Sequence, residues 1–293
     1  MFRFSDLSLI ESNLIRYFLF QCMIAVLCFQ SCAPKAFLIN QPKLVSLYFD
    51  KKIVKLEKND DSSLRIQRKT MRTKIEYGFG IIMEEADRII DIDYNKGIKK
   101  YKKAYDLFQD SKLKGISILA EKHPDFEQWL RGELDIDFSK DDVNDLYWLA
   151  AAYGGAISSS RANPHELVHL PRVGRLLNKC INLEPNWNSG ALYSAKMSFI
   201  TTKSDLSPQM LRDSLDYYFN KAIDLSNGMD AGPYLSYAES VHKLFQEKNK
   251  FINKLNHVID MDNISGGDYE LTNLIAKRRA KWLLSNIDNY FIE

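Results

Sequence analysis

The sequence predicts an all-α protein made of stacked helical hairpins, a tetratricopeptide-like repeat array. Three observations lead to this fold class. Only 13 Gly and 8 Pro occur among 293 residues, which disfavours a chain of short strands and tight turns. The stretches between prolines carry apolar residues at helical spacing. A short pattern also recurs at intervals close to the length of one helical hairpin.

The composition is that of a globular protein with enough apolar material for a large core. Hydrophobic residues make up 45% of the chain and charged residues 27%. The 40 Lys and Arg against 38 Asp and Glu leave a net charge of +2, so no basic excess points to a nucleic acid partner. Beyond residue 32 a single cysteine, Cys180, remains, which excludes an internal disulfide framework there.

Residues 1–31 are predicted to be a signal peptide. The apolar run 17–29 is 13 residues long and is interrupted by Gln21, whereas a membrane-spanning helix needs about 20 apolar residues. Ser31 then places a small residue directly before Cys32, as in the lipobox of bacterial lipoproteins. We therefore expect acylation of Cys32, with an uncleaved anchor or ordinary secretion as the alternatives. Two or more acyl chains would give stable membrane attachment.

Residues 32–70 are predicted to be a lipid-anchored tether. They contain Pro34 and Pro42 and a polar, lysine-rich stretch at 51–63 with weak periodicity. The apolar residues at 44–49 indicate no more than short local structure. A helical-repeat domain is then predicted to follow.

This helical-repeat domain covers residues 71–293. After Pro208, five apolar residues follow one another at steps of 4, 3, 4 and 3: Leu211, Leu215, Tyr218, Ala222 and Leu225. At about 100° per residue these side chains form one stripe, as a helix facing a core requires. A second stripe ends at Cys180, which is therefore predicted to be a small buried core residue and not a nucleophile.

A weak internal repeat appears near the ends of the predicted helices. Lys-Cys-Ile-Asn-Leu at 179–183 and Lys-Ala-Ile-Asp-Leu at 221–225 share a small second residue, and similar segments surround Ala104 and Val258. The positions from 104 to 258 divide into four steps of about 38 residues, near the period of helix-turn-helix repeats. A small residue at one point of each second helix lets a neighbouring helix approach closely, so such units stack.

One segment matches a zinc-binding motif. The residues of this H-E-x-x-H pattern are His165, Glu166 and His169. On a helix the two imidazoles would share a face and bind zinc, with the glutamate as general base. Pro171 should bend or end that helix, and arginines occupy the places where the extended motif needs Gly and a third His. We favour an exposed first helical turn beginning at Pro164, and keep a zinc metallohydrolase as an alternative function.

No other catalytic arrangement is visible, so we predict no catalytic residue and no cofactor. The chain has no nucleophile elbow, no phosphate-binding glycine loop and no spaced cysteine set. Lysines at 99, 100, 102 and 103 form a basic cluster on a predicted helix. A solvated face is the expected role of this cluster, and contact with lipid headgroups is the alternative.

Five segments together resemble the T-component of TRAP (tripartite ATP-independent periplasmic) transporters. They are YGFGIIMEEAD at 77–87, YWLAAAYGGAIS at 147–158, LEPNWNSGAL at 183–192, YFNKAIDLS at 218–226 and LTNLIAKRRAKWLL at 271–284. The resemblance covers about residues 71–293. It implies an all-helical, tetratricopeptide-like lipoprotein that faces the periplasm. The family usually has a further helical pair where residues 40–70 lie, and the sequence departs from the family there.

The resemblance also implies a function and partners. Family members assemble as trimers and associate with the extracytoplasmic solute-binding component, so we expect an accessory component of a TRAP transport system in the bacterial cell envelope. It would bind the periplasmic solute-binding protein and a small organic or hydrophobic ligand. An envelope scaffold of the same fold without a transport role is the alternative.

Aromatic residues supply the candidates for a ligand or partner surface. They make up 12% of the chain. Tyr147, Trp148 and Tyr153 lie on one predicted helix, and Trp187 lies at a joint between helices. Such side chains can line an apolar groove or pore. Ordinary core packing is the competing interpretation, and we favour it for Trp148.

Overall fold

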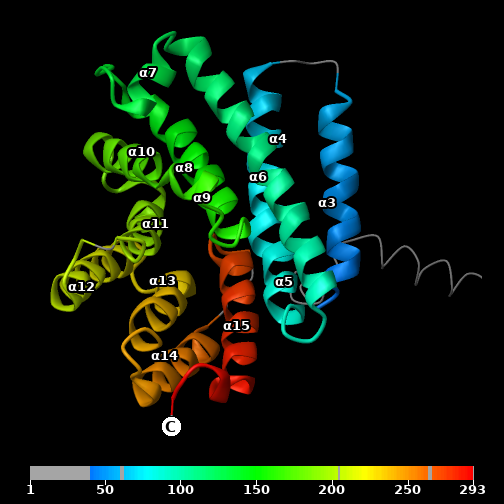
Figure 1. The fold of residues 1–293 in the computed structure, drawn as a ribbon, viewed down its shortest axis with the longest axis vertical. Helices are drawn as coiled ribbons and strands as arrows, with labels where there is room; N and C mark the ends of the chain where they lie inside the picture. The colour runs from blue at the N-terminus through cyan, green and yellow to red at the C-terminus, as the bar shows by residue number, and fades with distance from the viewer. Residues whose placement is uncertain (1–39, 60–62, 204, 263–265, 293) are drawn as a thin grey trace, which may run out of the picture. The chain divides into compact units, whose positions relative to one another are not determined.

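Helices provide the regular structure of the described part of the chain (Figure 1). The computed structural model describes residues 40–59, 63–203, 205–262 and 266–292, and no strand occurs within these ranges. Residues 42–293 belong to one unit of contacting helices. The predicted signal peptide and Cys32 lie outside the described residues.

The helices follow one another with short connections. The first part contains α3 (Pro42–Glu57), α4 (Leu64–Tyr77), the π-helical segment η1 (Gly78–Met83), α5 (Glu84–Ile89), α6 (Tyr94–Lys122) and α7 (Phe126–Arg131). The middle part contains the 3₁₀ turn η2 (Lys140–Asp142), α8 (Val143–Ser159), α9 (Pro164–Leu167), α10 (Leu170–Leu183) and η3 (Trp187–Gly190). The last part contains α11 (Ala191–Ile200), α12 (Pro208–Leu225), α13 (Ala231–Tyr237), the π-helical segment η4 (Ala238–His242), α14 (Lys248–Asp260), α15 (Glu270–Ser285) and η5 (Ile287–Asn289).

Local sequence explains where several helices begin. The Asp93 carboxylate accepts a hydrogen bond from the backbone N–H of Lys96, 3.0 Å away, and caps α6. The Ser207 hydroxyl caps α12, and Pro208 occupies its first turn, where the missing N–H costs nothing. α12 then runs along the apolar stripe that the sequence predicted.

The helical unit begins before residue 71, so the predicted tether is wrong for residues 42–57 and 64–70. Ile53 of α3 and Met71 of α4 are buried, and the ring of Phe49 stacks on that of Tyr77 at a centroid distance of 4.9 Å. Lysines interrupt the apolar pattern of α3, so packing against α4, rather than periodicity, stabilises this helix. The predicted departure from the family's helical pair at residues 40–70 is therefore also wrong, because α3 and α4 lie there.

The packing of successive helices confirms the all-α fold class. α4 contacts α6, α6 contacts α8, α8 contacts α10, and α11 contacts α12. A regular tetratricopeptide-like repeat is not confirmed, since helix lengths vary from four residues in α9 to 29 in α6. The four small positions of the sequence repeat, Ala104, Cys180, Ala222 and Val258, are nevertheless all buried.

α6 approaches α8 and η1 closely at the fully buried ring of Phe108. A Cβ atom on Gly155 would lie 2.4 Å from this ring, and one on Gly78 would lie 2.6 Å from it. Both positions therefore need glycine for the helices to pack at this distance. The adjacent Gly154 is different, because a Cβ atom there would meet no other group within 4 Å.

Substitutions at the two adjacent glycines should have opposite effects on stability. Gly154→Ala is expected to raise the free energy of unfolding by about 0.5–1 kcal/mol, because alanine is preferred inside helices. Gly155→Ala is expected to lower it by about 1–3 kcal/mol, because the added methyl group collides with Phe108. Urea denaturation of both variants measures the difference, and similar values for the two would contradict the packing of α6 on α8.

Candidate binding pocket and buried polar clusters

An apolar pocket of about 260 Å³ lies between α8, α10 and α11. Tyr147 and Gly154 of α8, Val173 of α10 and Phe199 of α11 line it, together with Phe79 of η1. The volume is just below the range of about 300–1,000 Å³ that is typical of small-molecule sites.

Small side chains on α8 create this space. Ala150, Ala151 and Gly154 line the pocket where larger residues would fill it. Four of the described lining residues carry a hydroxyl group: Tyr147, Ser158, Ser198 and Thr202. None of the described residues that line the pocket is charged. The pocket thus suits an uncharged, mostly apolar molecule with few polar groups.

Tyr147 and Trp187 come together beside this pocket. Their ring centroids are 4.7 Å apart. Tyr147 lines the pocket, and Trp187 packs against Tyr147 from outside the lining. Burial raises the pKa of Tyr147 to about 12, so the hydroxyl stays protonated and can donate a hydrogen bond at neutral pH.

The structure places Trp148 and Tyr153 away from the pocket. The Arg72 guanidinium lies 5.1 Å from the ring centroid of Trp148, and Trp148 packs against the core formed by α4, η1 and α6. Tyr153 is only 1% exposed, and its hydroxyl accepts a hydrogen bond from Arg172 at 3.2 Å. Sequence reasoning missed Phe79 and Phe199 as lining residues, because nothing in the pattern showed which helices would meet.

The H-E-x-x-H segment does not form the helix that a zinc site requires. α9 ends at Leu167, and α10 begins at Leu170 with Pro171 in its first turn, so the predicted helix break is confirmed. His165 therefore lies on α9, while His169 precedes α10. No group of three His, Cys, Asp or Glu side chains within the described residues could hold a metal ion. The residues of the motif therefore do not form the arrangement that the zinc metallohydrolase alternative would need.

Glu166 is buried, so the prediction of an exposed turn is wrong for this residue. Its side chain accepts a hydrogen bond from the Tyr105 hydroxyl at 2.8 Å and another from the Gln109 amide. The Lys112 ammonium lies 3.5 Å from its second carboxylate oxygen. All three partners belong to α6, more than 50 residues earlier in the chain. A local sequence pattern could not reveal this contact.

His169 lies next to the same cluster in an environment that disfavours a positive charge. Its Nδ1 atom is buried without a hydrogen-bond partner among the described residues, and its ring contacts Tyr153 at a centroid distance of 5.6 Å. Burial lowers the pKa of His169, and the positive charges of Arg172 and Lys112 lower it further.

A buried cluster of charges around Arg279 joins α15 to α5 and η4. The guanidinium lies 2.6 Å from a carboxylate oxygen of Glu84 and 2.8 Å from one of Asp87, both on α5. It also forms two hydrogen bonds with Glu239 of η4, at 2.8 and 2.9 Å. Burial by itself would lower the pKa of Arg279, but the three carboxylates raise it overall. The Tyr101 hydroxyl of α6 donates to Asp87 and adds a fourth element.

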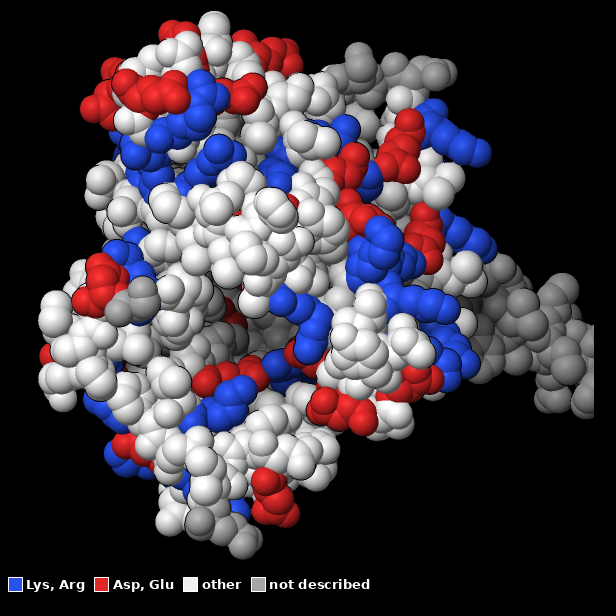
Figure 2. Space-filling model, viewed as in Figure 1, with Lys and Arg blue, Asp and Glu red and all other residues white. Residues whose placement is uncertain are grey.

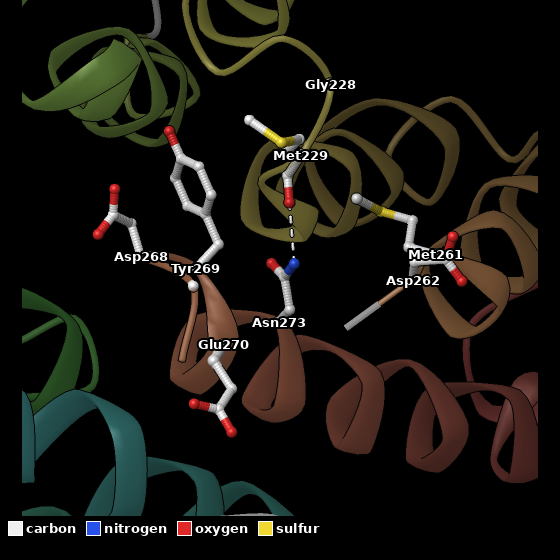
Figure 3. Close-up of a pocket in the computed structure, with 9 residues that line it drawn as sticks. Gly228, Met229, Met261, Asp262, Asp268, Tyr269, Glu270 and Asn273 are labelled. Atoms are coloured by element: carbon white, nitrogen blue, oxygen red, sulfur yellow. Dashed lines mark hydrogen bonds between the residues drawn. The ribbon is translucent and has the colours of Figure 1, made fainter. Parts of the chain in front are cut away.

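A second and more polar pocket, of about 490 Å³, lies at the start of α15 (Figure 3). The Asn273 amide donates a hydrogen bond to the carbonyl of Met229 at 2.8 Å. Its side-chain oxygen accepts one from the N–H of Ala231, also at 2.8 Å. Asn273 thus connects the start of α13 with α15, and both of its contacts are structural.

Fold and pocket together define a helical-hairpin protein with an apolar cavity between its helices. Residues 53–291 match the family model described as TRAP transporter T-component, and the chain belongs to that family. This membership gives it an accessory role in a TRAP transporter and a place in the bacterial envelope, and the family is not known for enzymes. A comparison with curated proteins finds no match. None of the helices described here has the length and apolar character needed to cross a membrane.

The pKa of His169 predicts a pH dependence of stability. Because the folded protein binds this proton less readily than the unfolded chain, stability is full above the ordinary His pKa of about 6.5 and falls as the pH drops below it. His169→Asn should reduce this loss, as measured by the urea midpoint between pH 7.5 and pH 5. His165→Asn, at an exposed position of α9, is the control. A profile unchanged by His169→Asn would contradict the role of burial.

Proposed function

We propose that this protein is a lipid-anchored, periplasm-facing accessory lipoprotein that binds the solute-binding protein of a TRAP transporter and a small organic or apolar ligand. The family match over residues 53–291 is the observation that carries the proposal. The apolar pocket adds a place for the ligand, and the protein would hold this molecule without transforming it.

The pocket chemistry supports a mostly apolar ligand. Its lining combines aliphatic and aromatic side chains with the hydroxyl groups of Tyr147, Ser158, Ser198 and Thr202. A ligand with a hydrocarbon body and one carbonyl or hydroxyl group could bury the first and hydrogen-bond with the second. A free carboxylate would find no cation among these lining residues.

The sequence supports the proposed anchor, and the family supports the proposed assembly. Acylation of Cys32 would attach the chain to a membrane, as the small residue before it and the apolar run 17–29 indicate. We further propose that the protein assembles as a trimer. Mass spectrometry of the mature protein tests the lipid on Cys32, and light scattering in detergent tests the oligomeric state.

Partner capture separates this proposal from an envelope scaffold of the same fold. Crosslinking in cells, followed by purification in detergent, should recover a periplasmic solute-binding protein together with this chain. Recovery of outer-membrane assembly factors alone would contradict the transport role and favour the scaffold.

Filling the pocket should weaken ligand binding without unfolding the protein. Gly154→Leu places a branched side chain into the open space beside Gly154. We expect it to weaken binding of 1-aminoanthracene, an uncharged apolar probe, at least tenfold, or about 1.4 kcal/mol. Fluorescence titration measures the affinity. Ser117→Leu, at an exposed position of α6, is the matched control. Equal affinities of the two variants would show that the probe does not bind in this pocket.

A further inference from the structure

α3 has an outward face that combines apolar and basic side chains. At about 100° per residue, seven exposed positions fall within a sector of about 120°. They are Leu44, Leu47, Tyr48, Lys51, Val54, Lys55 and Lys58. The four apolar side chains are 47–59% exposed, which is unusual for four large residues on one face of one helix.

Both carboxylates of α3 point away from this outward face and are neutralised by the rest of the protein. The Asp50 carboxylate lies 2.9 Å from the ammonium group of Lys103 on α6. Glu57 forms an ion pair with the buried ammonium of Lys74 on α4. Within the described residues, no ion pair links a carboxylate to the lysines of the outward face. The face therefore carries a positive charge that nothing in this part of the chain balances.

Basic side chains continue from α3 onto the start of α6. Lys43 of α3 and Lys99 of α6 line an open hollow of about 500 Å³ together with Ser46. Two ion pairs, Asp50–Lys103 and Glu85–Lys100, also line it, so Lys43 and Lys99 supply its excess positive charge. Figure 2 shows several blue side chains along the edge of the molecule where α3 lies, with red side chains among them. Two ammonium groups and a hydroxyl group suit a phosphate group.

The distance to the membrane is limited by the chain itself. Cys32 precedes Pro42, the first residue of α3, by ten positions. Ten extended residues span at most about 35 Å. If Cys32 is acylated, as proposed above, α3 is the first of the described helices after the anchor and lies within this reach of the bilayer surface.

We propose that the outward face of α3 lies on the surface of an anionic phospholipid bilayer. Leu44, Leu47, Tyr48 and Val54 would enter the boundary between headgroups and acyl chains, while the lysines would contact lipid phosphates. A twofold contact of this face with the same face of a second copy is disfavoured, because it would bring the lysines of one face against those of the other. The inference rests on the anchored state of the proposed function and adds a fixed orientation of the protein on the membrane.

Fluorescence quenching in vesicles tests this orientation. The mature, acylated protein, which begins at Cys32, carries Leu47→Cys and is labelled with the fluorophore NBD. Its remaining native thiol, Cys180, is buried. The protein is reconstituted into vesicles of phosphatidylethanolamine and phosphatidylglycerol that contain a nitroxide lipid. We expect strong quenching at position 47 and none at a label on Met210→Cys of α12, which is similarly exposed. Phosphatidylcholine vesicles or 0.5 M salt should reduce the quenching at position 47.

Charge variants test the contribution of the lysines. We expect a triple variant to lower the ratio of protein with α3 on the membrane to protein with α3 off it about 100-fold, at roughly fivefold for each lysine. The variant combines Lys51→Gln, Lys55→Gln and Lys58→Gln. The matched control removes three exposed lysines elsewhere: Lys140→Gln, Lys221→Gln and Lys281→Gln. Protein that floats with the vesicles but shows no quenching at position 47 would contradict the docking of α3 and leave the anchor intact. Quenching that does not depend on anionic lipid would contradict the docking in the same way. Protein that does not float would overturn the anchor as well.

Discussion

Arg279 connects parts of the protein that are far apart in the sequence. It binds Glu84 and Asp87, which precede it by 195 and 192 residues, and Glu239, which precedes it by 40. With the guanidinium only 18% exposed, loss of this cation would leave three carboxylates close together in a poorly solvated place. These ion pairs link α15 to α5, and Figure 1 shows the two helices near each other.

The ion pairs of Arg279 are linked to the binding pocket through η1, which precedes α5. Phe79 of η1 lines the pocket and packs on Phe108 with ring centroids 4.6 Å apart, and η1 continues directly into α5, where Arg279 is bound. The space opposite Phe79 comes from alanines and Gly154 on α8. An ion cluster, a π-helical segment and small residues on one helix thus set the shape of the cavity.

The sequence predicted the parts of this structure that depend on local patterns. The stripe along α12 and the helix break before Pro171 were confirmed, because caps, prolines and apolar spacing act within a few residues. Contacts between distant helices were not predictable in this way. Glu166 is buried by partners on α6, and α3 is stabilised by packing rather than by its own pattern. For the candidate site, the aromatic segment on α8 led to Tyr147, but it could not show that Trp148 and Tyr153 turn away.

Hydrogen exchange measured by mass spectrometry tests most directly whether Arg279 unites the two ends of the chain and supports the pocket. In Arg279→Met, protection should fall at least 100-fold in both η1–α5 and η4, since breaking a buried ion pair costs about 3–5 kcal/mol. Arg278→Met, one position away, should leave both regions protected. Loss of protection confined to α15, or equal profiles for the two variants, would contradict this account of the fold and of the pocket that depends on it.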